Sequence, residues 1–489
     1  MDITDKLNMT MLCDFYELTM GNGYLEAGLK DRITYFDIFF RDVPDHGGYA
    51  ICAGLERIIA YIQDLHFSEE DIEYLRSKDL FSERFLDYLR DFKFTGDVWA
   101  IPEGTPIFPR EPIITVRAPA IQAQLVETFL LLIFNHQSLV ATKTNRIVRA
   151  AEGRVVLEFG SRRAQGTDAA ISGARAAYIG GCAGTACTIS DQLFGVPAGG
   201  TMAHAWVQMF DSEYEAFKTY CEVFPTNATL LVDTYNTLKS GVPNAIKAFN
   251  EVLRPKGITK CAIRLDSGDI AYLTREARQM LDEAGWESCK ISASNSLDEY
   301  IIQDILRQGA KVDLFGVGER MITSKSDPVF GGVYKLAAIM DRHTGKFIPK
   351  IKLSENTEKV TNPGNKTIQR IYDKETGKII ADLICLVDEE FDEKNSLLLF
   401  DPIETWKKTH LAPGTYTMRE LLVPIFKNGE CVYESPKVMD IREYCKKEQE
   451  TLWDESRRLV NPHEIHVDLS NELWHMKAQL LDSYHYTSN

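Results

Sequence analysis

The sequence predicts a mixed α/β protein built around a (β/α) barrel, and three observations favour this fold. Short apolar runs of strand length alternate with helix-length segments that carry apolar residues at intervals of three or four, such as 242–254, 271–285 and 297–309. Polar or glycine residues follow about six of the apolar runs. Buried parallel strands read as such runs, and a barrel gathers the residues after them on one face. A doubly wound open sheet fits the same periodicity and stays open as an alternative.

Length and composition limit the class of protein. A chain of 489 residues predicts two or three domains, and 44% hydrophobic with 26% charged residues is typical of a soluble globular protein. The formal net charge of −16 argues against broad binding to nucleic acid or to anionic membranes. We find no uninterrupted apolar run of membrane-spanning length and no signal peptide in the first residues, and we therefore expect a cytoplasmic protein.

The regions on either side of the barrel are richer in strand patterns. Residues 14–20 look like an amphipathic helix, 33–40 alternate like a strand, and 124–149 form a long helical pattern that leads into the barrel. Beyond the barrel, 346–353 and 378–386 resemble strands, and 441–459 resembles a charged helix. We expect residues 1–135 and 341–489 to form one discontinuous α/β domain with a helical tail, and residues 136–340 to form the barrel.

The cysteines and paired histidines give no metal site. The 10 cysteines show no C-x-x-C spacing, so free buried thiols are expected. His463 and His466 resemble a metal pair, but their spacing departs from H-E-x-x-H and no third ligand stands nearby. We interpret them as part of a loop in the tail.

The run Glu158–Gly166 is the most informative motif. It places an acid, the ring of Phe159 and the cations Arg162 and Arg163 where an apolar strand ends and a helix begins. Ligands gather at such junctions because helix N-termini and loop amides point there. The two arginines indicate an anionic ligand, and the ring offers a flat surface. A surface turn held by salt bridges is the alternative interpretation.

Further motifs follow in a fixed order. They are Asp14–Gly21, Glu158–Gly166, Gly200–His204, Asp233–Asn236, Arg264–Asp269, Ser294–Asn295, Gly316–Gly318, Gly331–Lys335, Asn461–Glu464 and Val467–Ser470. Each is weak alone, whereas their joint order and spacing resemble the nicotinate phosphoribosyltransferase family, whose members are type II phosphoribosyltransferases. The resemblance covers the whole chain.

The resemblance implies a reaction in NAD biosynthesis. Nicotinate and phosphoribosyl pyrophosphate would give nicotinate mononucleotide and pyrophosphate, coupled to ATP hydrolysis as in a ligase. It also implies a barrel of the type II kind, a discontinuous α/β sandwich domain, Mg²⁺ as cofactor and a homodimer that shares its active sites through an N-terminal helix. The sequence does not identify the direct ligands of the metal.

The resemblance also implies roles for residues that would hold phosphoribosyl pyrophosphate. Asp233 and Asp266 would contact ribose hydroxyls or the metal shell, although an aspartate in a strand–helix turn also serves as a helix cap. Backbone amides at the next two strand ends would bind the 5′-phosphate, at residues Ser294, Asn295, Gly316, Gly318 and Glu319. At position 319 the compared relatives carry a small hydroxyl residue, so a side-chain contact there is in doubt.

For nicotinate, the resemblance implies two rings and a cation. Phe159 would stack on one face of the pyridine and Tyr16 of a partner subunit on the other, although Tyr16 also fits an interface or core aromatic. Arg264 would bind the carboxylate, with Thr201 as a further donor. Arg162 would bind phosphate or the carboxylate, and the sequence does not separate these roles. Nicotinamide-using relatives place an acid after the helix that follows the arginine turn, whereas residues 180–187 contain none, which favours nicotinate.

His204 would account for the use of ATP. Its imidazole would accept the γ-phosphoryl group to give a phosphohistidine, and we expect Asp233 to orient the ring. His136 and His343 lack such a motif and are expected to be structural.

Other functions stay open as alternatives. The closest are a nicotinamide phosphoribosyltransferase and a non-catalytic binding paralogue on the same fold. A quinolinate enzyme would be shorter and would need more cations, and an aldolase would need a lysine at a strand end, which none of these strand ends carries.

Overall fold

The chain folds into two compact units in the computed structural model, which describes residues 8–353 and 360–486. The central unit contains Val140–Pro328 and Lys437–Arg442. The discontinuous unit contains Met1–Leu139, Val329–Pro436 and Glu443–Asn489. The sequence predicts boundaries after residues 135 and 340, and it does not predict that the short stretch 437–442 groups with the central unit.

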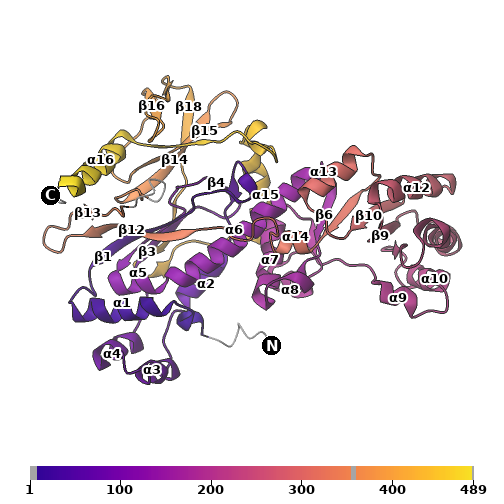
Figure 1. Cartoon of the computed structure of the whole chain (residues 1–489), viewed down its shortest axis with the longest axis horizontal. Helices are drawn as coiled ribbons and strands as arrows, with labels where there is room; N and C mark the ends of the chain where they lie inside the picture. Colours follow the sequence, from indigo (N-terminus) through magenta and orange to yellow (C-terminus); the bar gives the residue numbers. More distant parts are fainter. Residues whose placement is uncertain (1–7, 354–359, 487–489) are drawn as a thin grey trace. The chain divides into compact units, whose positions relative to one another are not determined.

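The central unit contains a six-stranded parallel sheet in the order β7-β6-β11-β10-β9-β8. Figure 1 labels β6, β9 and β10 of this sheet. The strands are β6 (Val155–Glu158), β7 (Gly184–Thr185), β8 (Thr229–Leu231), β9 (Ala262–Leu265), β10 (Lys290–Ser294) and β11 (Leu314–Val317). Leu230, Ile263, Ile291 and Phe315 are fully buried in these strands. Parallel strands covered on both faces require such apolar runs, which is why the sequence pattern predicts them.

The strand order distinguishes between the two sheet topologies that the periodicity leaves open. Strands that follow each other along the chain pair, except β7 and β8, which lie at the two edges of the sheet; the first strand, β6, pairs with the last, β11. A doubly wound sheet instead reverses its order at a switch point. The observed order is that of a ring of strands interrupted between β7 and β8. Because no pairing closes this gap among the described strands, the barrel stays a prediction.

Helices connect the strands of the central unit. They are α7 (Thr167–Ile179), α8 (Thr188–Phe194), α9 (His204–Gln208), α10 (Glu213–Val223), α11 (Val242–Ala248), α12 (Ile270–Glu283), α13 (Glu299–Arg307) and α14 (Glu319–Ile322). Several begin with a polar cap, after a strand end or after another helix. Asp269 accepts the amide hydrogen of Tyr272 at 2.9 Å at the start of α12, and Ser212 caps α10 in the same way. The caps fix where each helix begins and so fix the loops that precede it.

The discontinuous unit joins the two ends of the chain in a common sheet. A seven-stranded sheet has the order β13-β12-β1-β5-β3-β19-β20, with β1 (Ile33–Phe39), β3 (Asp97–Ala100), β5 (Ile114–Pro119), β12 (Val333–Met340), β13 (Phe347–Pro349), β19 (Val423–Lys427) and β20 (Glu430–Cys431). β1 pairs antiparallel with β12, and β3 pairs antiparallel with β19. Strands before and after the central unit therefore depend on each other for their hydrogen bonds.

Smaller sheets and helices complete this unit. A four-stranded sheet contains β18 (Tyr416–Glu420), β14 (Lys366–Asp373), β15 (Ile379–Leu386) and β21 (His466–Leu469), and the two-stranded sheets pair β2 (Ala50–Ile51) with β4 (Pro106–Ile107) and β16 (Leu397–Phe400) with β17 (Lys408–Leu411). The helices are α1 (Phe15–Glu26), α2 (Leu55–Gln63), α3 (Glu69–Arg76), α4 (Glu83–Arg90), α5 (Ala120–Leu125) and α16 (Asn471–Tyr486). Two further helices, α6 (Glu127–Ala150) and α15 (Val438–Glu450), cross a unit boundary.

Two predicted elements differ from the structure. The helix predicted over 441–459 ends at Glu450, because the chain turns there: the Trp453 indole N–H donates to the carbonyl oxygen of Ile379 at 2.7 Å. The strand predicted over 346–353 is limited to Phe347–Pro349. Contacts between residues far apart in the sequence set these ends, and the periodicity of the sequence carries no information about such contacts.

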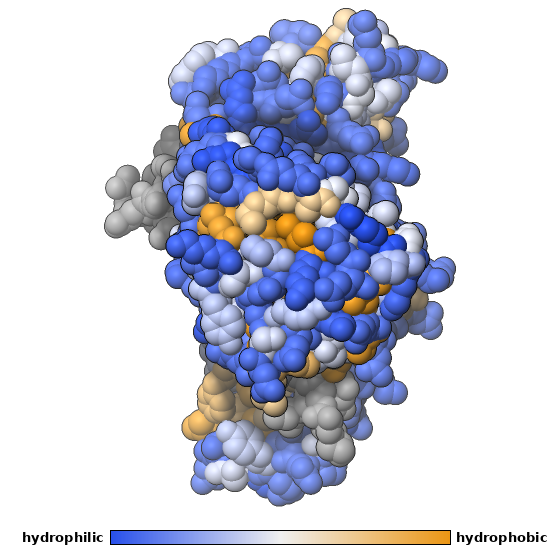
Figure 2. All heavy atoms as spheres, turned by 90° about the vertical axis from the view of Figure 1, so that its right-hand side faces the viewer, coloured by the Kyte–Doolittle hydropathy of each residue, from blue (hydrophilic) through white to orange (hydrophobic). Residues whose placement is uncertain are grey.

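One helical stretch is apolar enough to cross a membrane by length and composition. It covers Ala120–Ala150, and 67% of its most apolar window is buried inside the protein, which is the pattern of a core helix. Figure 2 shows a face of the molecule that is mostly hydrophilic, with a small hydrophobic band near its middle. The cytoplasmic location stays a prediction.

A buried charge cluster ties β14 to β15 in the discontinuous unit. Arg370 is fully buried and donates from Nε and Nη2 to the carboxylate of Asp382 at 2.8 and 2.6 Å, and from Nη2 to the carbonyl oxygen of Pro106 at 2.8 Å. Glu111 lies 4.0 Å from the same nitrogen, and burial followed by the charge of Asp382 raises the pKa of Glu111. The Arg370 guanidinium thus pairs with the carboxylate of Asp382, and the raised pKa of Glu111 favours the neutral form of this second acid.

Replacing Arg370 by Met should therefore destabilise the fold strongly. Removing one partner of a buried ion pair typically costs about 3–5 kcal/mol, since the remaining charge has no counter-ion. Denaturant unfolding of Arg370→Met would measure the loss in the free energy of unfolding. The exposed arginine in Arg84→Met serves as control, for which we expect little change; equal stabilities of the two variants would contradict this role of Arg370.

Candidate active site

Side chains from four strand ends of the central unit surround a pocket of about 510 Å³. They lie at or just beyond the ends of β6, β9, β10 and β11, Ala186 adds the loop after β7, and the segment 200–203 closes one side. Ten of the predicted residues line the pocket: Phe159, Arg162, Thr201, Arg264, Asp266, Ser294, Asn295, Gly316, Gly318 and Glu319. The strands thus bring residues together that are up to 160 positions apart in the sequence, as we expect of the carboxyl edge of a parallel sheet.

The ring of Phe159 is fixed against the end of β11. A Cβ atom on Gly316 would lie 2.5 Å from two ring carbons of Phe159, and a Cβ atom on Gly318 would lie 2.9 Å from the Phe159 carbonyl oxygen. The amide of Phe159 donates to the carbonyl oxygen of Val317 at 2.7 Å. These glycines are therefore needed for the ring and its backbone to approach β11, a reason that the sequence pattern alone does not reveal.

The preceding residue, Glu158, anchors this turn from inside the protein. It is fully buried, accepts the hydroxyl hydrogen of Thr185 at 2.5 Å and accepts the amide hydrogen of Gly160. Burial raises the pKa of Glu158, and the two hydrogen bonds act in the opposite direction. The acid of the motif is thus a structural support for Phe159 and the arginine turn.

Arg264 supplies a half-buried cation with unused hydrogen-bonding capacity. Its Nη1 donates to Thr201 Oγ1 at 2.7 Å, and its Nε is buried without a partner among residues 8–353 and 360–486. Burial lowers the pKa of Arg264, while the carboxylates of Asp266 and Asp233 act in the opposite direction. A guanidinium with a free N–H suits a planar carboxylate or a phosphate.

Three strand ends are linked by the carboxylates of Asp233 and Asp266. Asp233 Oδ2 accepts the amide hydrogen of Asp266 at 2.9 Å and the hydroxyl hydrogen of Ser267 at 2.6 Å. Asp266 Oδ1 accepts the hydroxyl hydrogen of Ser294 at 2.5 Å. Asp233 Oδ1 is buried and has no hydrogen-bond partner in the described part of the chain. Neither aspartate caps a helix here, so the alternative interpretation as caps does not describe them; Asp269 caps α12 instead.

His204 lies at the start of α9 and is not oriented as the sequence predicts. We expected Asp233 to hold its ring, but Nδ1 lies 3.2 Å from the hydroxyl oxygen of Thr234. Nε2 lies 3.8 Å from Asp266 Oδ2, which is beyond hydrogen-bond length. Asp233 is instead used by Asp266 and Ser267, so its neighbour Thr234 is the residue that reaches the imidazole.

The loop after β10 has an unusual backbone. Asn295 and Ser296 have φ of 88° and 50°, which non-glycine residues rarely adopt. Asp298 caps α13 through the amides of Tyr300 and Ile301 at 3.1 and 2.9 Å. The loop is therefore held in one conformation where it enters the helix.

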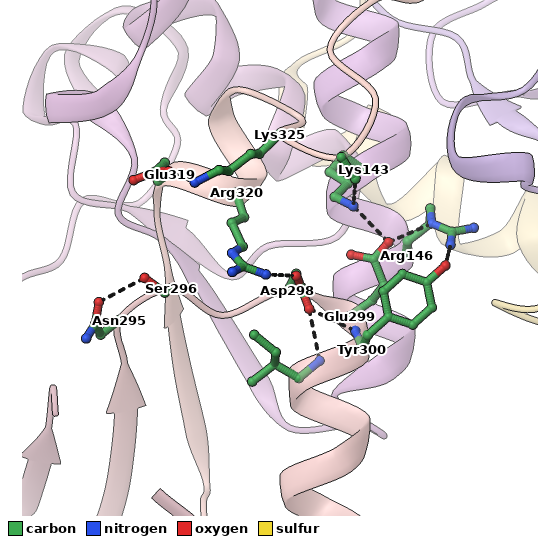
Figure 3. A network of polar contacts seen from close by, with 12 residues as sticks. Lys143, Arg146, Asn295, Ser296, Asp298, Glu299, Tyr300, Glu319, Arg320 and Lys325 are labelled. Carbon is green, nitrogen blue, oxygen red and sulfur yellow. Dashed lines mark hydrogen bonds and ion pairs between the residues drawn. The ribbon is translucent and has the colours of Figure 1, made fainter. Parts of the chain in front are cut away.

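A buried ion cluster supports the same helix start (Figure 3). Glu299, which is fully buried, accepts from Lys143 Nζ at 2.8 Å and from Arg146 Nε at 2.9 Å. Arg320, which follows Glu319, forms an ion pair with Asp298 and so links the loops after β10 and β11. Both predicted phosphate-binding loops are thus tied to one set of charges.

The negative charge of Glu319, at a position where a small hydroxyl residue was expected, is offset by a neighbouring lysine. Lys325 Nζ lies 2.6 Å from the Glu319 carboxylate, and this contact lowers the pKa of Glu319 (Figure 3). The pair offsets the negative charge that the side chain would otherwise bring to the pocket. Backbone contacts at position 319 stay available for a ligand.

The pocket carboxylates suit a metal that is bound mainly through its substrate. The described ranges contain no group of three or more His, Cys, Asp or Glu residues arranged to hold an ion, and this includes His463 and His466. Mg²⁺ is usually bound through one or two carboxylates together with substrate phosphates and water. The unpartnered Asp233 Oδ1 and the neighbouring Asp266 fit this kind of site.

Tyr16 lies in α1 of the discontinuous unit, where 43% of it is exposed. Burial of its hydroxyl and the nearby carboxylate of Glu127 raise the pKa of Tyr16. Its helix neighbours Phe15 and Met20 are also exposed.

Several pocket residues were not predicted. Ala186, Met202, Ala203 and Ser296 line the pocket, and Thr234 and Ser267 contact its polar network. Arg163, which the sequence marks with Arg162 as a cation for an anionic ligand, lines the pocket as well. Met202, Ala203, Thr234 and Ser267 lie inside motifs that the sequence identifies, and Ser296 directly follows one, so the motifs mark their positions although not their contacts. Ala186 comes from the loop after β7, where no polar signal marks it.

Comparisons with known proteins identify the family of the chain. Residues 11–135 match the model of the nicotinate phosphoribosyltransferase (NAPRTase) N-terminal domain, and residues 365–477 match that of the nicotinate phosphoribosyltransferase C-terminal domain. The chain is 41% identical over 472 residues to nicotinate phosphoribosyltransferase of Bacillus subtilis, covering 96% of this chain and 95% of the relative. The corresponding protein of Dictyostelium discoideum is 33% identical, with 95% and 87% covered.

A solved structure extends the likeness to the fold. The crystal structure of human nicotinic acid phosphoribosyltransferase superimposes with a TM-score of 0.84 at 28% identity, over 96% of this chain and 99% of the human chain. The family expected from the motifs is thereby confirmed: the chain belongs to the nicotinate phosphoribosyltransferase family.

Proposed function

We propose that this protein transfers the phosphoribosyl group of phosphoribosyl pyrophosphate to nicotinate, giving nicotinate mononucleotide and pyrophosphate in NAD biosynthesis. The observation that carries the proposal is the pairing, in one pocket, of the Phe159 ring and the Arg264 cation with the Asp266–Ser294 network. The first two suit a flat aromatic acid, and the third suits ribose hydroxyls. Family membership supports the same reaction.

Nicotinate would bind through its ring and its carboxylate. Phe159 offers a ring face that β11 holds in place, and Arg264 Nε offers a buried donor without a partner. Thr201 keeps the guanidinium oriented by accepting from Nη1. A neutral amide would leave this cation without a counter-ion in a half-buried position, which favours nicotinate over the alternative nicotinamide.

Phosphoribosyl pyrophosphate would occupy the other strand ends. Backbone amides of 294–296 and 316–319 would receive the 5′-phosphate, and Arg162 and Arg163 would attract the anionic groups. In the reaction the pyridine nitrogen forms a bond to C1′ of the ribose while the bond from C1′ to the pyrophosphate oxygen breaks, and no proton moves. Asp233 and Asp266 would hold Mg²⁺, which when bound neutralises charge on the pyrophosphate.

ATP would be used through His204. Nε2 forms no hydrogen bond with any residue that the structure describes, so we assign it as the nitrogen that attacks the γ-phosphorus of ATP, with ADP leaving. Thr234 beside Nδ1 would hold the ring. Water would later break the phosphorus–nitrogen bond and release phosphate, which would couple ATP hydrolysis to the transfer.

We also propose the expected assembly and barrel. Leu12, Phe15, Tyr16 and Met20 leave an apolar surface exposed on and beside α1, which supports a homodimer in which Tyr16 reaches a partner's site. The ring-like order of the six parallel strands supports a barrel. A non-catalytic paralogue stays the alternative until turnover is measured.

Turnover tests the function directly. With phosphoribosyl pyrophosphate, Mg²⁺ and ATP, we expect nicotinate mononucleotide to form together with ADP, and much less product when nicotinamide replaces nicotinate. Chromatography of the nucleotides would count both products. Absence of product with nicotinate, although the pocket still binds phosphoribosyl pyrophosphate, would favour the non-catalytic alternative.

The variant His204→Ala should separate transfer from ATP use. Because no other nitrogen takes the place of Nε2, ADP release should fall to background while a slow, uncoupled transfer to nicotinate persists. Both products would be quantified in the same reaction. His343→Ala, which removes an exposed histidine of the discontinuous unit, is the matched control and should behave as the unsubstituted protein. Unchanged ADP release from His204→Ala would contradict the assignment.

The variant Arg264→Gln should weaken nicotinate binding selectively. A hydrogen bond to a charged group contributes about 1.5–3 kcal/mol, so KM for nicotinate should rise roughly 10- to 150-fold. Steady-state kinetics with nicotinate and with nicotinamide would be compared on the same variant. We expect the preference for nicotinate to shrink; an equal loss with both substrates would show that Arg264 serves the phosphoribosyl group instead.

A further inference from the structure

A second pocket, of about 380 Å³, lies within the discontinuous unit and shares no residue with the candidate active site. Its walls come from β1, β14, β15, β21 and one face of α16, together with the turn at Arg110. Trp474, Lys477, Ala478 and Leu481 stand on α16 at helical spacing, so one side of this helix closes the pocket. Small-molecule sites typically begin at about 300 Å³.

The pocket contains more positive than negative charge. Lys366, which is buried, donates to Asp37 at 2.8 Å, and this pair is neutral as a whole. Lys477 donates to the uncharged side-chain oxygen of Asn362 at 2.9 Å. Arg110 makes no side-chain hydrogen bond or ion pair within the described ranges. Two cations, Arg110 and Lys477, are therefore left without a counter-ion.

Their environment makes this charge costly. Burial, followed by the charges of Arg110 and Lys366, lowers the pKa of Lys477 to about 8. Arg110 has a φ of 72°, a backbone conformation that non-glycine residues rarely adopt. This residue lines the pocket and contributes a guanidinium to it. An anion between the two side chains would offset their mutual repulsion and raise the pKa of Lys477 back toward its ordinary value.

The rest of the pocket is apolar. Phe39, Ile384 and Leu469 line it from three strands, and Trp474 faces it from α16. The Trp474 indole N–H donates to the carbonyl oxygen of Pro402 at 3.2 Å, and its ring meets Phe400 edge-on with the ring centroids 6.0 Å apart, so these contacts hold the indole in place in the pocket wall. A bare inorganic ion would leave these surfaces uncovered, whereas a ligand with an aromatic body would cover them.

We propose that this pocket is a second ligand site, which binds a small aromatic monoanion with its charged group between Arg110 and Lys477 and its ring against Trp474. The nearby ion pair of Lys366 and Asp37 joins β14 to β1, strands of two different sheets. A ligand beside this pair contacts both sheets and stabilises the discontinuous unit. The site is independent of the proposed transferase reaction.

Binding of 8-anilinonaphthalene-1-sulfonate, an aromatic monoanion, tests the proposal on the full chain. We expect saturable fluorescence enhancement with one equivalent bound and a rise in the thermal midpoint. The neutral analogue N-phenyl-1-naphthylamine should bind at least about 10-fold more weakly, because it cannot satisfy the cations. Equal affinities for the two dyes, or displacement of the sulfonate by millimolar inorganic phosphate alone, would overturn the site as proposed.

Variants place the probe in the molecule. Lys477→Met and Arg110→Asn should each weaken the sulfonate at least about 10-fold; asparagine tolerates the left-handed backbone at position 110. Lys447→Met, at an exposed lysine of α15, is the matched control and should not change binding. Arg264→Gln, in the other pocket, should also leave binding unchanged. Thermal unfolding confirms that each variant is folded, and binding lost in Arg264→Gln but kept in Lys477→Met would refute the site.

Discussion

The carboxylate of Asp233 is the contact on which the geometry of the candidate active site depends most. It accepts from the backbone of Asp266 and from Ser267, and Asp266 in turn accepts from Ser294. Three parallel strands are thereby joined at their ends by side chains as well as by their ladder. Because each hydrogen bond fixes the rotamer of the next carboxylate, the pocket presents its oxygens in one arrangement before any ligand arrives.

Sequence reasoning reached the parallel strands and most pocket residues because both follow from local rules. Apolar runs predict buried strands, and the residue after each run must lie at the sheet edge, as for Phe159, Arg264 and Ser294. Which neighbour of such a residue reaches a given atom depends on loop conformation. Thr234, one position after Asp233, contacts His204 for that reason, and no periodicity could have distinguished the two. The end of the helix at Glu450 could not be predicted for a similar reason, because a contact distant in the sequence, that of Trp453 with Ile379, fixes the chain there.

The acidic protein concentrates positive charge where anions are expected. Its formal net charge is −16, yet Arg162, Arg163 and Arg264 line a single pocket, and Lys325 offsets the charge of Glu319 at the end of the loop after β11. Screening limits long-range attraction at physiological salt to about 8 Å, so local cations outweigh the distant acidic surface. The net charge therefore argues against broad nucleic-acid binding and is compatible with a site for a small anion. In the second pocket, Arg110 and Lys477 likewise place local positive charge in an acidic protein.

The loop after β10 indicates why the central unit contains a buried ion cluster. Asn295 and Ser296 adopt positive φ, which costs about 1 kcal/mol or more for each such residue and persists only where the surroundings fix the backbone. Glu299, held by Lys143 and Arg146, and Asp298, held by Arg320, fix the chain just beyond the loop. An apolar helix start would pack as well but would not restrain direction, because dispersion contacts are not directional. The charges of α13 are thus best understood as the restraint that keeps the loop amides in place for an anion.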